Sequence, residues 1–567
     1  MSVYPKKELA QLVLQLCEKH GISEVVISPG SRNAPLIIGF VNHNSFKTFE
    51  IADERSAAFF ALGIAQQTKK PVAVLCTSGS ALLNYYPAVA EAYYSKIPLV
   101  VISTDRPAHM LDIGDGQTIR QANVFSNHIL FSANLLEIEN EGERVRLPDN
   151  AALVREALNI AREQNGPVHI NVPLDEPLYA TVPELYDYKE FVFQEKQKGK
   201  NSLLDEEPLD VAALEKYTEI WNRAEKKLVL VGSNYPDALL DTQIAHLLKD
   251  PSVLVFTETI SNIHHPDCIG RIDQLISPLT EKEFQDLRPD ILLTFGGMIV
   301  SKKVKQFLRD YKPEQHWHVD KHEAPDTFFC LSKHFSLSPQ LFFSQFFFLT
   351  KSRKSDYQER WLQVKRDREK VHNLFLAGAP FSDLKVFQLI LASLPKKVQL
   401  QLGNSSVVRY AQLFDSDPTI PVFCNRGTSG IDGSTSTAVG AAWYCKEETV
   451  FISGDISFFY DSNGLWNRYI KNDFRIILIN NGGGGIFRIM PGPKDSNVLE
   501  YFEYPHSLTA KQLAEMHGFS YCNVYSIEEI QRELESFYES SDKPKLLEIL
   551  TPSSLNDVVL KEYFKKL

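Results

Sequence analysis

Two stretches toward the carboxyl-terminal end of the chain combine oxygen-bearing side chains with unhindered backbone. The apolar run VFIS ends on Gly454 and Asp455, and the later run FRIILIN ends on Asn481, directly before the glycines at 482–485. Carboxylate, amide and main-chain oxygens are ligands that Mg²⁺ accepts while it keeps positions open for phosphate oxygens. Glycine lets bare backbone approach such a ligand closely. The pattern therefore predicts a metal-bridged diphosphate site.

A strand, one helix-length segment and a second strand must position these oxygens. In a parallel sheet both strand ends emerge at the same edge, where α/β proteins bind ligands, so Asp455 and Asn481 should meet. A strand that merely ends in Gly-Asp is the structural alternative. Two other phosphate motifs are missing: no Gly-Lys-Ser/Thr follows the glycines, and no G-x-G-x-x-G opens a helix after the first strand.

Composition and charge narrow the class of protein. The 567 residues are 44% hydrophobic and 23% charged, which is typical of a globular protein with several domains. A net charge of −11 argues against a nucleic-acid partner. The seven scattered cysteines, without a C-x-x-C, indicate neither a disulfide framework nor a zinc site. We find no apolar segment long enough for a membrane span and no signal-peptide core, and expect a cytoplasmic protein.

Helix-like and strand-like stretches alternate in three blocks of the chain. Short β-branched runs separated by helices indicate βαβ units and parallel sheets. We therefore predict an α/β fold with three Rossmann-like parallel-sheet domains, at residues 1–180, 205–350 and 375–567. The second block looks shorter than the others. The charged stretch 180–208 is predicted to be a linker, and 351–373 a connecting helix with a solvated face.

A carboxylate and several cations stand at other predicted strand ends. Glu54 follows the strand FKTFEIAD and opens a helix beside Asp53, although both could be ordinary helix-terminal charges favoured by the dipole. The guanidinium group of arginine binds carboxylates in a bidentate way, so arginines at these edges indicate anionic substrates, even if each one alone could be a surface residue. The polar and cationic set comprises Ser31, Arg32, Arg106, Gln117, Lys302, Ser405, Arg409 and Arg426.

The GD-to-NN spacing resembles the diphosphate-binding signature of thiamin diphosphate (ThDP) enzymes. The segments SPGSRNAPL, TSGSALLNYYPAV, STDRPAHM, NRGTSGIDGSTST and INNGGGGIF resemble one family among them, the 2-succinyl-5-enolpyruvyl-6-hydroxy-3-cyclohexene-1-carboxylate synthases. The resemblance covers residues 6 to about 490 and departs at Ile456, where ThDP enzymes usually have glycine. It implies the pyruvate decarboxylase-like architecture of pyrimidine-binding, central and diphosphate-binding domains, in a homodimer or homotetramer with sites at the subunit interface.

The resemblance also implies a reaction and residue roles. The reaction is ThDP- and metal-dependent decarboxylation of 2-oxoglutarate and 1,4-addition of the succinyl carbanion equivalent to isochorismate, a step of menaquinone biosynthesis. Asp455, Asn481 and the main-chain oxygen of Gly483 would bind Mg²⁺, or Mn²⁺, and Glu54 would lie beside N1′ of the aminopyrimidine. Further implied cofactor contacts are Ser405, Gly454, Ile456, Gly484, Ile486 and Phe487, with Ile431 as the apolar prop beneath the bent cofactor. Implied substrate-binding residues are Ser31, Arg32, Arg106, Lys302, Ser405, Arg409 and Arg426, with Arg32, Arg106 and Gln117 also catalytic.

Two alternatives stay open. Another ThDP-dependent 2-oxo acid decarboxylase or carboligase would share the cofactor residues but would need fewer cations. A catalytically inactive binding protein could retain the fold, because fold does not fix function. The intact Glu54, Asp455 and Asn481 speak against such a loss of activity.

Overall fold

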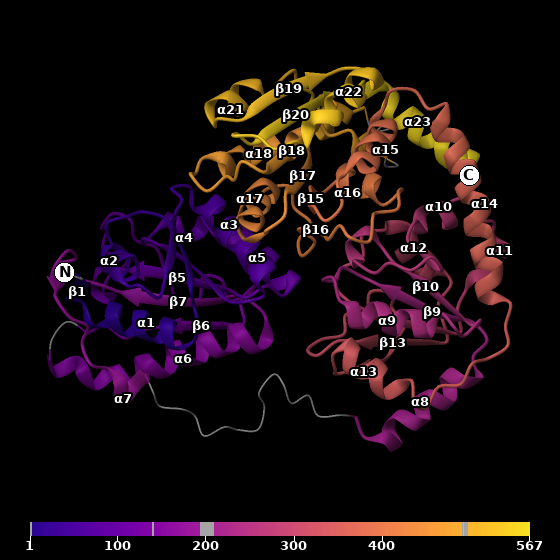
Figure 1. The fold of residues 1–567 in the computed structure, drawn as a ribbon. Coiled ribbons are helices and arrows are strands. Elements are labelled where there is room, and N and C mark those ends of the chain that lie inside the picture. The colour runs from indigo at the N-terminus through magenta and orange to yellow at the C-terminus, as the bar shows by residue number, and fades with distance from the viewer. Residues whose placement is uncertain (1–2, 139–140, 193–208, 490–491, 493–496) are drawn as a thin grey trace. The chain divides into compact units, whose positions relative to one another are not determined.

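The computed structural model describes residues 3–138, 141–192, 209–489, 492 and 497–567, which form two compact units. Unit 1 comprises residues 1–200, 427–446 and 457–474, and unit 2 comprises 201–426, 447–456 and 475–567. One six-stranded sheet lies in unit 1 and two lie in unit 2 (Figure 1). The expected start of the second domain, residue 205, lies outside the described residues.

Unit 1 is built on a parallel sheet in the order β3-β2-β4-β5-β7-β6. Strands β4 and β5 are buried along their whole length, as expected where helices cover both faces of a parallel sheet. The strands are β2 (Glu24–Ile27), β3 (Lys47–Glu50), β4 (Val72–Cys76), β5 (Leu99–Asp105), β6 (Phe131–Asn134) and β7 (Val168–Pro173), and β1 (Tyr4–Pro5) pairs with β8 (Thr181–Val182) in a separate antiparallel ribbon.

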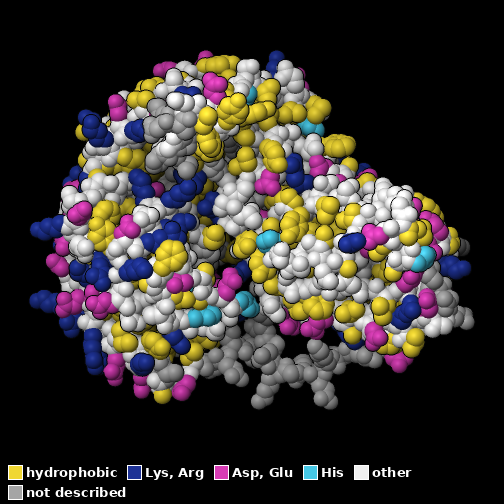
Figure 2. Space-filling model, turned by 180° about the vertical axis from the view of Figure 1, so that it is seen from behind, with side chains coloured by type: hydrophobic (Ala, Val, Ile, Leu, Met, Phe, Trp, Pro, Cys, Tyr) yellow, Lys and Arg dark blue, Asp and Glu magenta, His cyan; other side chains and the backbone are white. Residues whose placement is uncertain are grey.

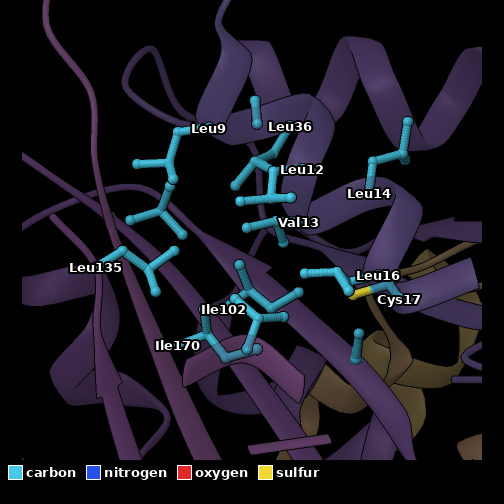
Figure 3. Close-up of a cluster of buried hydrophobic side chains, with 14 of the residues drawn as sticks. Leu9, Leu12, Val13, Leu14, Leu16, Cys17, Leu36, Ile102, Leu135 and Ile170 are labelled. Atoms are coloured by element: carbon cyan, nitrogen blue, oxygen red, sulfur yellow. The ribbon is translucent and has the colours of Figure 1, made fainter. Parts of the chain in front are cut away.

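A large apolar cluster lies between this sheet and helices α1, α2 and α6. Figure 3 shows Val13 of α1 close to Ile102 of β5, and Leu9 of α1 and Ile170 of β7 belong to the same cluster. Each such side chain contributes roughly 1.5–3 kcal/mol when it is buried. The helices of the unit are α1 (Glu8–Lys19), α2 (Ala34–Asn42), α3 (Glu54–Thr68), α4 (Ser80–Asn84), α5 (Tyr86–Ser95), α6 (Leu147–Gln164), α7 (Lys189–Val192) and α17 (Ser434–Tyr444), with 3-10 turns η1 (Ala108–Met110), η2 (Glu141–Arg146) and η4 (Ser462–Leu465).

Helices α3 and α17 cross at two glycines, although they are far apart in the sequence. A Cβ atom at Gly63 would lie 2.2 Å from the Thr437 carbonyl oxygen, and one at Gly440 would lie 2.1 Å from the Phe60 carbonyl oxygen. The backbones therefore touch directly. This crossing sets the helix that begins at Glu54 against the helix that follows the NRGTSGIDG segment.

Unit 2 contains a sheet in the order β11-β10-β9-β12-β13-β14 and a second in the order β16-β15-β17-β18-β20-β19. The first sheet has six strands, as many as the second and as the sheet of unit 1. Its strands are β9 (Lys227–Val231), β10 (Val253–Phe256), β11 (Cys268–Ile269), β12 (Ile291–Phe295), β13 (Gln315–Val319) and β14 (Leu331–Phe335). Those of the second are β15 (Gln399–Leu402), β16 (Val422–Cys424), β17 (Thr449–Gly454), β18 (Phe474–Asn480), β19 (Ser520–Val524) and β20 (Lys545–Leu550).

The helices of unit 2 surround these sheets. The expected connecting helix is present as α14, and Trp361 and Leu376 lie buried on it. The helices are α8 (Val211–Arg223), α9 (Ala238–Leu247), α10 (Ile272–Ile276), α11 (Glu281–Leu287), α12 (Lys302–Asp310), α13 (Pro339–Phe346), α14 (Tyr357–Ala377), α15 (Asp383–Ser393), α16 (Ser406–Ala411), α19 (Ile486–Ile489), α20 (Leu499–Glu503), α21 (Lys511–Met516), α22 (Ile527–Phe537) and α23 (Ser553–Lys566), with a 3-10 turn, η3 (Thr259–Ser261).

The crossover after Asp455 is not the single helix expected from the sequence. Helix α18 (Asp455–Tyr460) ends after six residues and the short η4 turn follows. Asp461 interrupts the helix because its buried carboxylate accepts hydrogen bonds from the backbone N–H of Ser436 at 2.7 Å and from the Ser436 hydroxyl at 2.8 Å. The residue that ends one helix thereby caps the first turn of α17.

The surface carries charges of both signs. Acidic and basic side chains both occur across the face in Figure 2, so the net charge of −11 is not gathered there into one acidic patch. Within the described residues, each helix is either too short or too polar to cross a lipid bilayer.

Candidate functional site

The ends of the neighbouring strands β17 and β18 bring Asp455 and the Asn481 loop together, as the strand pattern predicts. The Gly483 N–H donates to Asp455 Oδ2 at 2.9 Å, and the Ile456 N–H donates to Asp455 Oδ1 at 2.7 Å. The Asn481 side-chain amide donates to Asp383 Oδ2 at 3.0 Å. Its Oδ1 is buried and has no hydrogen-bond partner among the described residues. Such an acceptor normally has a partner, so this oxygen points to a missing ligand.

The glycine loop is shaped by the end of α20 and the residues that follow it. Gly483 has φ +148°, and a Cβ there would lie 2.7 Å from the Glu503 carbonyl oxygen, so only glycine fits. The Gly484 N–H donates to the same Glu503 oxygen at 2.6 Å, and the His506 N–H donates to the Gly482 carbonyl oxygen at 3.1 Å. Backbone contacts therefore hold the loop against residues 503–506.

The residues present fit a divalent metal ion. The described part of the chain has no metal site made of three or more His, Cys, Asp or Glu side chains, so the ligands must include amide and main-chain oxygens. A metal here would instead use Asp455, the free Asn481 Oδ1 and the Gly483 carbonyl, which already accepts a hydrogen bond from the Gly485 N–H at 2.9 Å and retains a second lone pair. These are hard oxygen donors, which suit Mg²⁺.

Two residues that the sequence interpretation missed support these ligands. His506 Nε2 lies 3.3 Å from Asp455 Oδ2, and the interaction with this carboxylate raises the pKa of the His506 imidazole. Asp383, at the start of α15, is fully buried, and burial raises the pKa of its carboxyl group to about 6. No local signal marks either residue, because an acidic residue in the first turn of a helix is common and His506 lies in a loop.

A second cluster in unit 2 gathers predicted substrate-binding residues. Ser405 has φ +67° and precedes α16, and Arg409 donates to its carbonyl oxygen at 2.6 Å. Arg426 is buried and donates to Asn404 Oδ1 at 2.8 Å. Burial and the nearby charge of Arg426 lower the pKa of the Arg409 guanidinium. Two cations that repel each other, the buried Arg426 and the half-buried Arg409, favour an anionic ligand, because an anion relieves their repulsion.

Lys302 and Lys305 differ in their relation to this cluster. Lys302 is exposed at the start of α12. Lys305 is half-buried and donates to the Ile299 carbonyl oxygen at 3.0 Å. Burial lowers the pKa of Lys305, and the charges of Glu258, Arg426 and Arg409 also act on it. Sequence reasoning selected Lys302 and did not consider Lys305. A signal was available, because residues three apart in a helix lie on the same face.

Glu258 links the elements around this cluster. Its carboxylate accepts from the N–H groups of Val300 and Ser301, both at 2.7 Å, and from the Gln412 amide at 3.1 Å. Burial raises the pKa of Glu258 to about 7, while the two N–H donors oppose this shift. The start of α12 and the end of α16 are therefore tied to one buried side chain.

In unit 1 the structure separates the neighbouring carboxylates Asp53 and Glu54. Asp53 caps α3 by accepting from the Ser56 N–H at 3.1 Å, and it also accepts from the Asn463 amide at 2.7 Å. Glu54 accepts from the Asn84 amide at 3.3 Å and lines an open pocket of about 490 Å³ with Trp466. Asp53 also lines this pocket, but its carboxylate is engaged as the cap of α3, whereas Glu54 accepts a hydrogen bond from Asn84 alone among the contacts described above.

The other predicted residues of unit 1 lie in two loops. Arg32 is buried and donates to the Leu174 carbonyl oxygen at 2.9 Å. Arg106 donates to the Gly116 carbonyl oxygen at 2.9 Å, next to the exposed Gln117, which has φ +54°. Ser31 is exposed. A cation and an amide therefore stand together in the loop that follows β5.

Buried polar residues hold these loops in place. Glu91 is the only charged residue of α5 and accepts from the N–H groups of Gly427 and Thr428, both at 2.7 Å, which fixes the loop before Ile431. Gln121 accepts from the Gly79 N–H at 2.8 Å and donates to the Asn171 side chain at 2.8 Å. A lone charge in an apolar helix was a signal for Glu91 that sequence reasoning did not use.

The apolar residues predicted to line the cofactor are half-buried. This group consists of Ile431, Ile456, Ile486 and Phe487. The Ile431 carbonyl oxygen accepts from the Ser457 hydroxyl at 2.9 Å, and the Phe487 ring lies 5.4 Å from that of Phe502. Partly exposed apolar surface of this kind is available to a ligand.

Comparison with known proteins identifies the family. Residues 7–127, 201–402 and 403–549 match the N-terminal TPP binding, middle and C-terminal TPP binding domains of thiamine pyrophosphate enzymes. Proteins of Flavobacterium johnsoniae and Flavobacterium psychrophilum named 2-succinyl-5-enolpyruvyl-6-hydroxy-3-cyclohexene-1-carboxylate (SEPHCHC) synthase are each 52% identical, with 100% of both chains covered. The chain belongs to the SEPHCHC synthase family. A Porphyromonas gingivalis protein of the same name is 39% identical over 99% of this chain and 98% of its own.

Membership of the SEPHCHC synthase family confirms several predictions made from the sequence. The α/β fold with the three domains of a ThDP enzyme is confirmed. The cofactor pair, ThDP with a divalent metal ion, and the class of enzyme are confirmed as well. The roles of single residues and the domain limits stay predictions.

Proposed function

We propose that the protein decarboxylates 2-oxoglutarate and adds the succinyl carbanion equivalent to isochorismate, with release of CO₂, in menaquinone biosynthesis. The observation that carries this proposal is the 52% identity over the full length of SEPHCHC synthases. We also propose domain limits of 1–180, 205–350 and 375–567, a homodimer or homotetramer with sites at the subunit interface, and a cytoplasmic location.

The diphosphate end of the cofactor would be held in unit 2. Asp455, Asn481 and the Gly483 carbonyl would bind Mg²⁺ or Mn²⁺, and the remaining metal positions would take phosphate oxygens. The bare backbone of Gly484 would allow close approach. Support comes from Asn481 Oδ1, which is buried and has no partner in the described part of the chain, and from the contact of Asp455 with the Gly483 N–H.

When bound, ThDP supplies a carbanion centre that can attack a 2-oxo acid and stabilise the product of CO₂ loss. Glu54 would hold a proton at N1′ of the aminopyrimidine ring. Its place at an open pocket, beside the helix cap Asp53, supports this role. Ile431, Ile486 and Phe487 would keep water from the reacting atoms.

The cations would bind the carboxylates of both substrates. Arg409 and Arg426 in unit 2, and Arg32 and Arg106 in unit 1, can each form charge-assisted hydrogen bonds without giving up a proton at neutral pH. Gln117 would donate to a substrate oxygen from the same loop as Arg106. A pyruvate-specific enzyme would need fewer such groups.

The test is a rate measurement with purified protein, ThDP and Mg²⁺. We expect consumption of 2-oxoglutarate only when isochorismate is present, and little turnover with pyruvate or aromatic 2-oxo acids. Glu54→Gln should lower turnover roughly 100-fold or more, because it removes the acid at N1′. The matched variant Asp53→Asn keeps the helix cap and should keep its rate.

Two results would contradict the proposal. Preference for another 2-oxo acid would move the protein to a different ThDP activity. A normal rate for Glu54→Gln, with a large loss for Asp53→Asn, would transfer the proton-holding role to Asp53.

A further inference from the structure

The buried carboxylate of Asp383 lies directly behind Asn481. Its Oδ2 accepts from Asn481 Nδ2 at 3.0 Å, and its Oδ1 accepts from the Thr551 hydroxyl at 2.6 Å. The Asp383 N–H itself donates to Asn556 Oδ1 at 2.8 Å. Residues from α23 and from the ends of β18 and β20 therefore converge on Asp383 at the start of α15.

The hydrogen bond from Asn481 decides which edge of its amide faces the cofactor. A carboxamide has one acceptor oxygen and one donor NH₂, and the two edges have nearly the same shape. An ionised carboxylate can only accept, so the NH₂ must turn toward Asp383. The oxygen then points away from Asp383, and it is this Oδ1 that is buried without a partner among the described residues.

The opposite orientation would damage a metal site. It would place a donor NH₂ where a cation needs an oxygen, and it would set the amide oxygen against the Asp383 carboxylate. The structure shows a comparable arrangement at Asp455, whose Oδ2 is held by the Gly483 N–H at 2.9 Å and by His506 at 3.3 Å. Both side chains that offer oxygens are thus oriented by groups behind them.

We propose that Asp383 is a positioning residue that fixes the Asn481 amide with its oxygen toward the divalent ion of the cofactor. This inference rests on the proposed role of Asn481 as a metal ligand. Outer contacts of this kind typically change metal affinity by about 10- to 100-fold. Asp383 does not touch the reacting atoms, so its effect must appear in binding of the metal.

The experiment measures Mn²⁺ binding to the full-length protein at saturating ThDP, from the electron paramagnetic resonance signal of free Mn²⁺. We expect Asp383→Ala to weaken binding about 10- to 100-fold. The matched control is Thr551→Val, which removes the other hydrogen bond of Asp383 but leaves the one from Asn481. It should lower the unfolding midpoint while Mn²⁺ affinity stays near that of the wild type.

A double-mutant cycle separates orientation from a general structural effect. Asn481→Asp presents an oxygen whichever way the side chain turns, so Asp383→Ala should cost little or no affinity in that background. An equal loss in both backgrounds would overturn the inference. If Asp383→Ala does not fold, Asp383→Ser, whose side chain is shorter, gives the same comparison.

The failure of this inference and that of the proposed site can be told apart. If Asn481→Ala binds Mn²⁺ as tightly as the wild type, the proposed metal site is wrong. If Asn481→Ala loses affinity and Asp383→Ala does not, the metal site stands and the positioning role of Asp383 is refuted.

Discussion

The crossing of α3 and α17 makes Gly63→Ala a sharp test of the packing in unit 1. The added Cβ would lie 2.2 Å from the Thr437 carbonyl oxygen and 2.8 Å from the Ala441 nitrogen, whereas ordinary contacts begin at 3.4 Å. Both neighbours are backbone atoms and cannot rotate away, so the helices must separate by about 1 Å.

The expected magnitude follows from two opposing effects. Overpacking costs about 1–3 kcal/mol, and a clash with backbone belongs at the upper end of this range. Alanine returns about 1 kcal/mol through its higher helix propensity. The net loss is about 2 kcal/mol, which corresponds to a fall of about 4–8 °C in the unfolding midpoint of a unit of this size.

Calorimetry of the wild type and two glycine variants checks this reasoning. Gly39 of α2 is the matched control, because a Cβ there would lie 3.6 Å from Leu14 and Pro5, in ordinary contact. Gly39→Ala should raise the free energy of unfolding by up to about 1 kcal/mol, and the unfolding midpoint should rise with it. A midpoint for Gly63→Ala equal to or above that of the wild type would refute the close crossing.

Three further predictions concern acid, a loop anchor and the metal. Burial lowers the pKa of His169 to about 3, so the unfolded chain binds a proton below pH 6.5 that the folded chain refuses. The free energy of unfolding should therefore decrease by about 2 kcal/mol as the pH is lowered from 7 to 5. Thermal unfolding at each pH measures this decrease, and His169→Gln should lack it. Glu91→Gln turns an NH₂ toward backbone donors of Gly427 or Thr428, and should lower stability by about 2–3 kcal/mol in calorimetry; an unchanged midpoint would contradict the anchoring role. Removal of the metal with a chelator should release ThDP. If ThDP is present at about 100 times its dissociation constant, its release should lower the free energy of unfolding by about 3 kcal/mol, and an unaffected holoenzyme would contradict the metal-bridged site.

Local pattern was enough to predict the parallel sheets and the place where Asp455 meets the Asn481 loop. Alternating apolar strands and helices determine a parallel α/β fold because strands buried on both faces need crossover helices on each side. The same rule predicted that Asp455 and the Asn481 loop meet, since neighbouring parallel strands end at one edge. The break after Tyr460 was not predicted, because it depends on Asp461 capping a helix that lies earlier in the chain.

The sequence by itself determined the strand ends, the glycine loop and the types of side chain available for a metal and for carboxylates. Only the tertiary structure showed that Asp383 faces Asn481, that His506 faces Asp455 and that Lys305 is half-buried while Lys302 is exposed. The reason is physical: a buried polar group must find a partner wherever the folded chain offers one, and such partners come from distant elements that share no spacing.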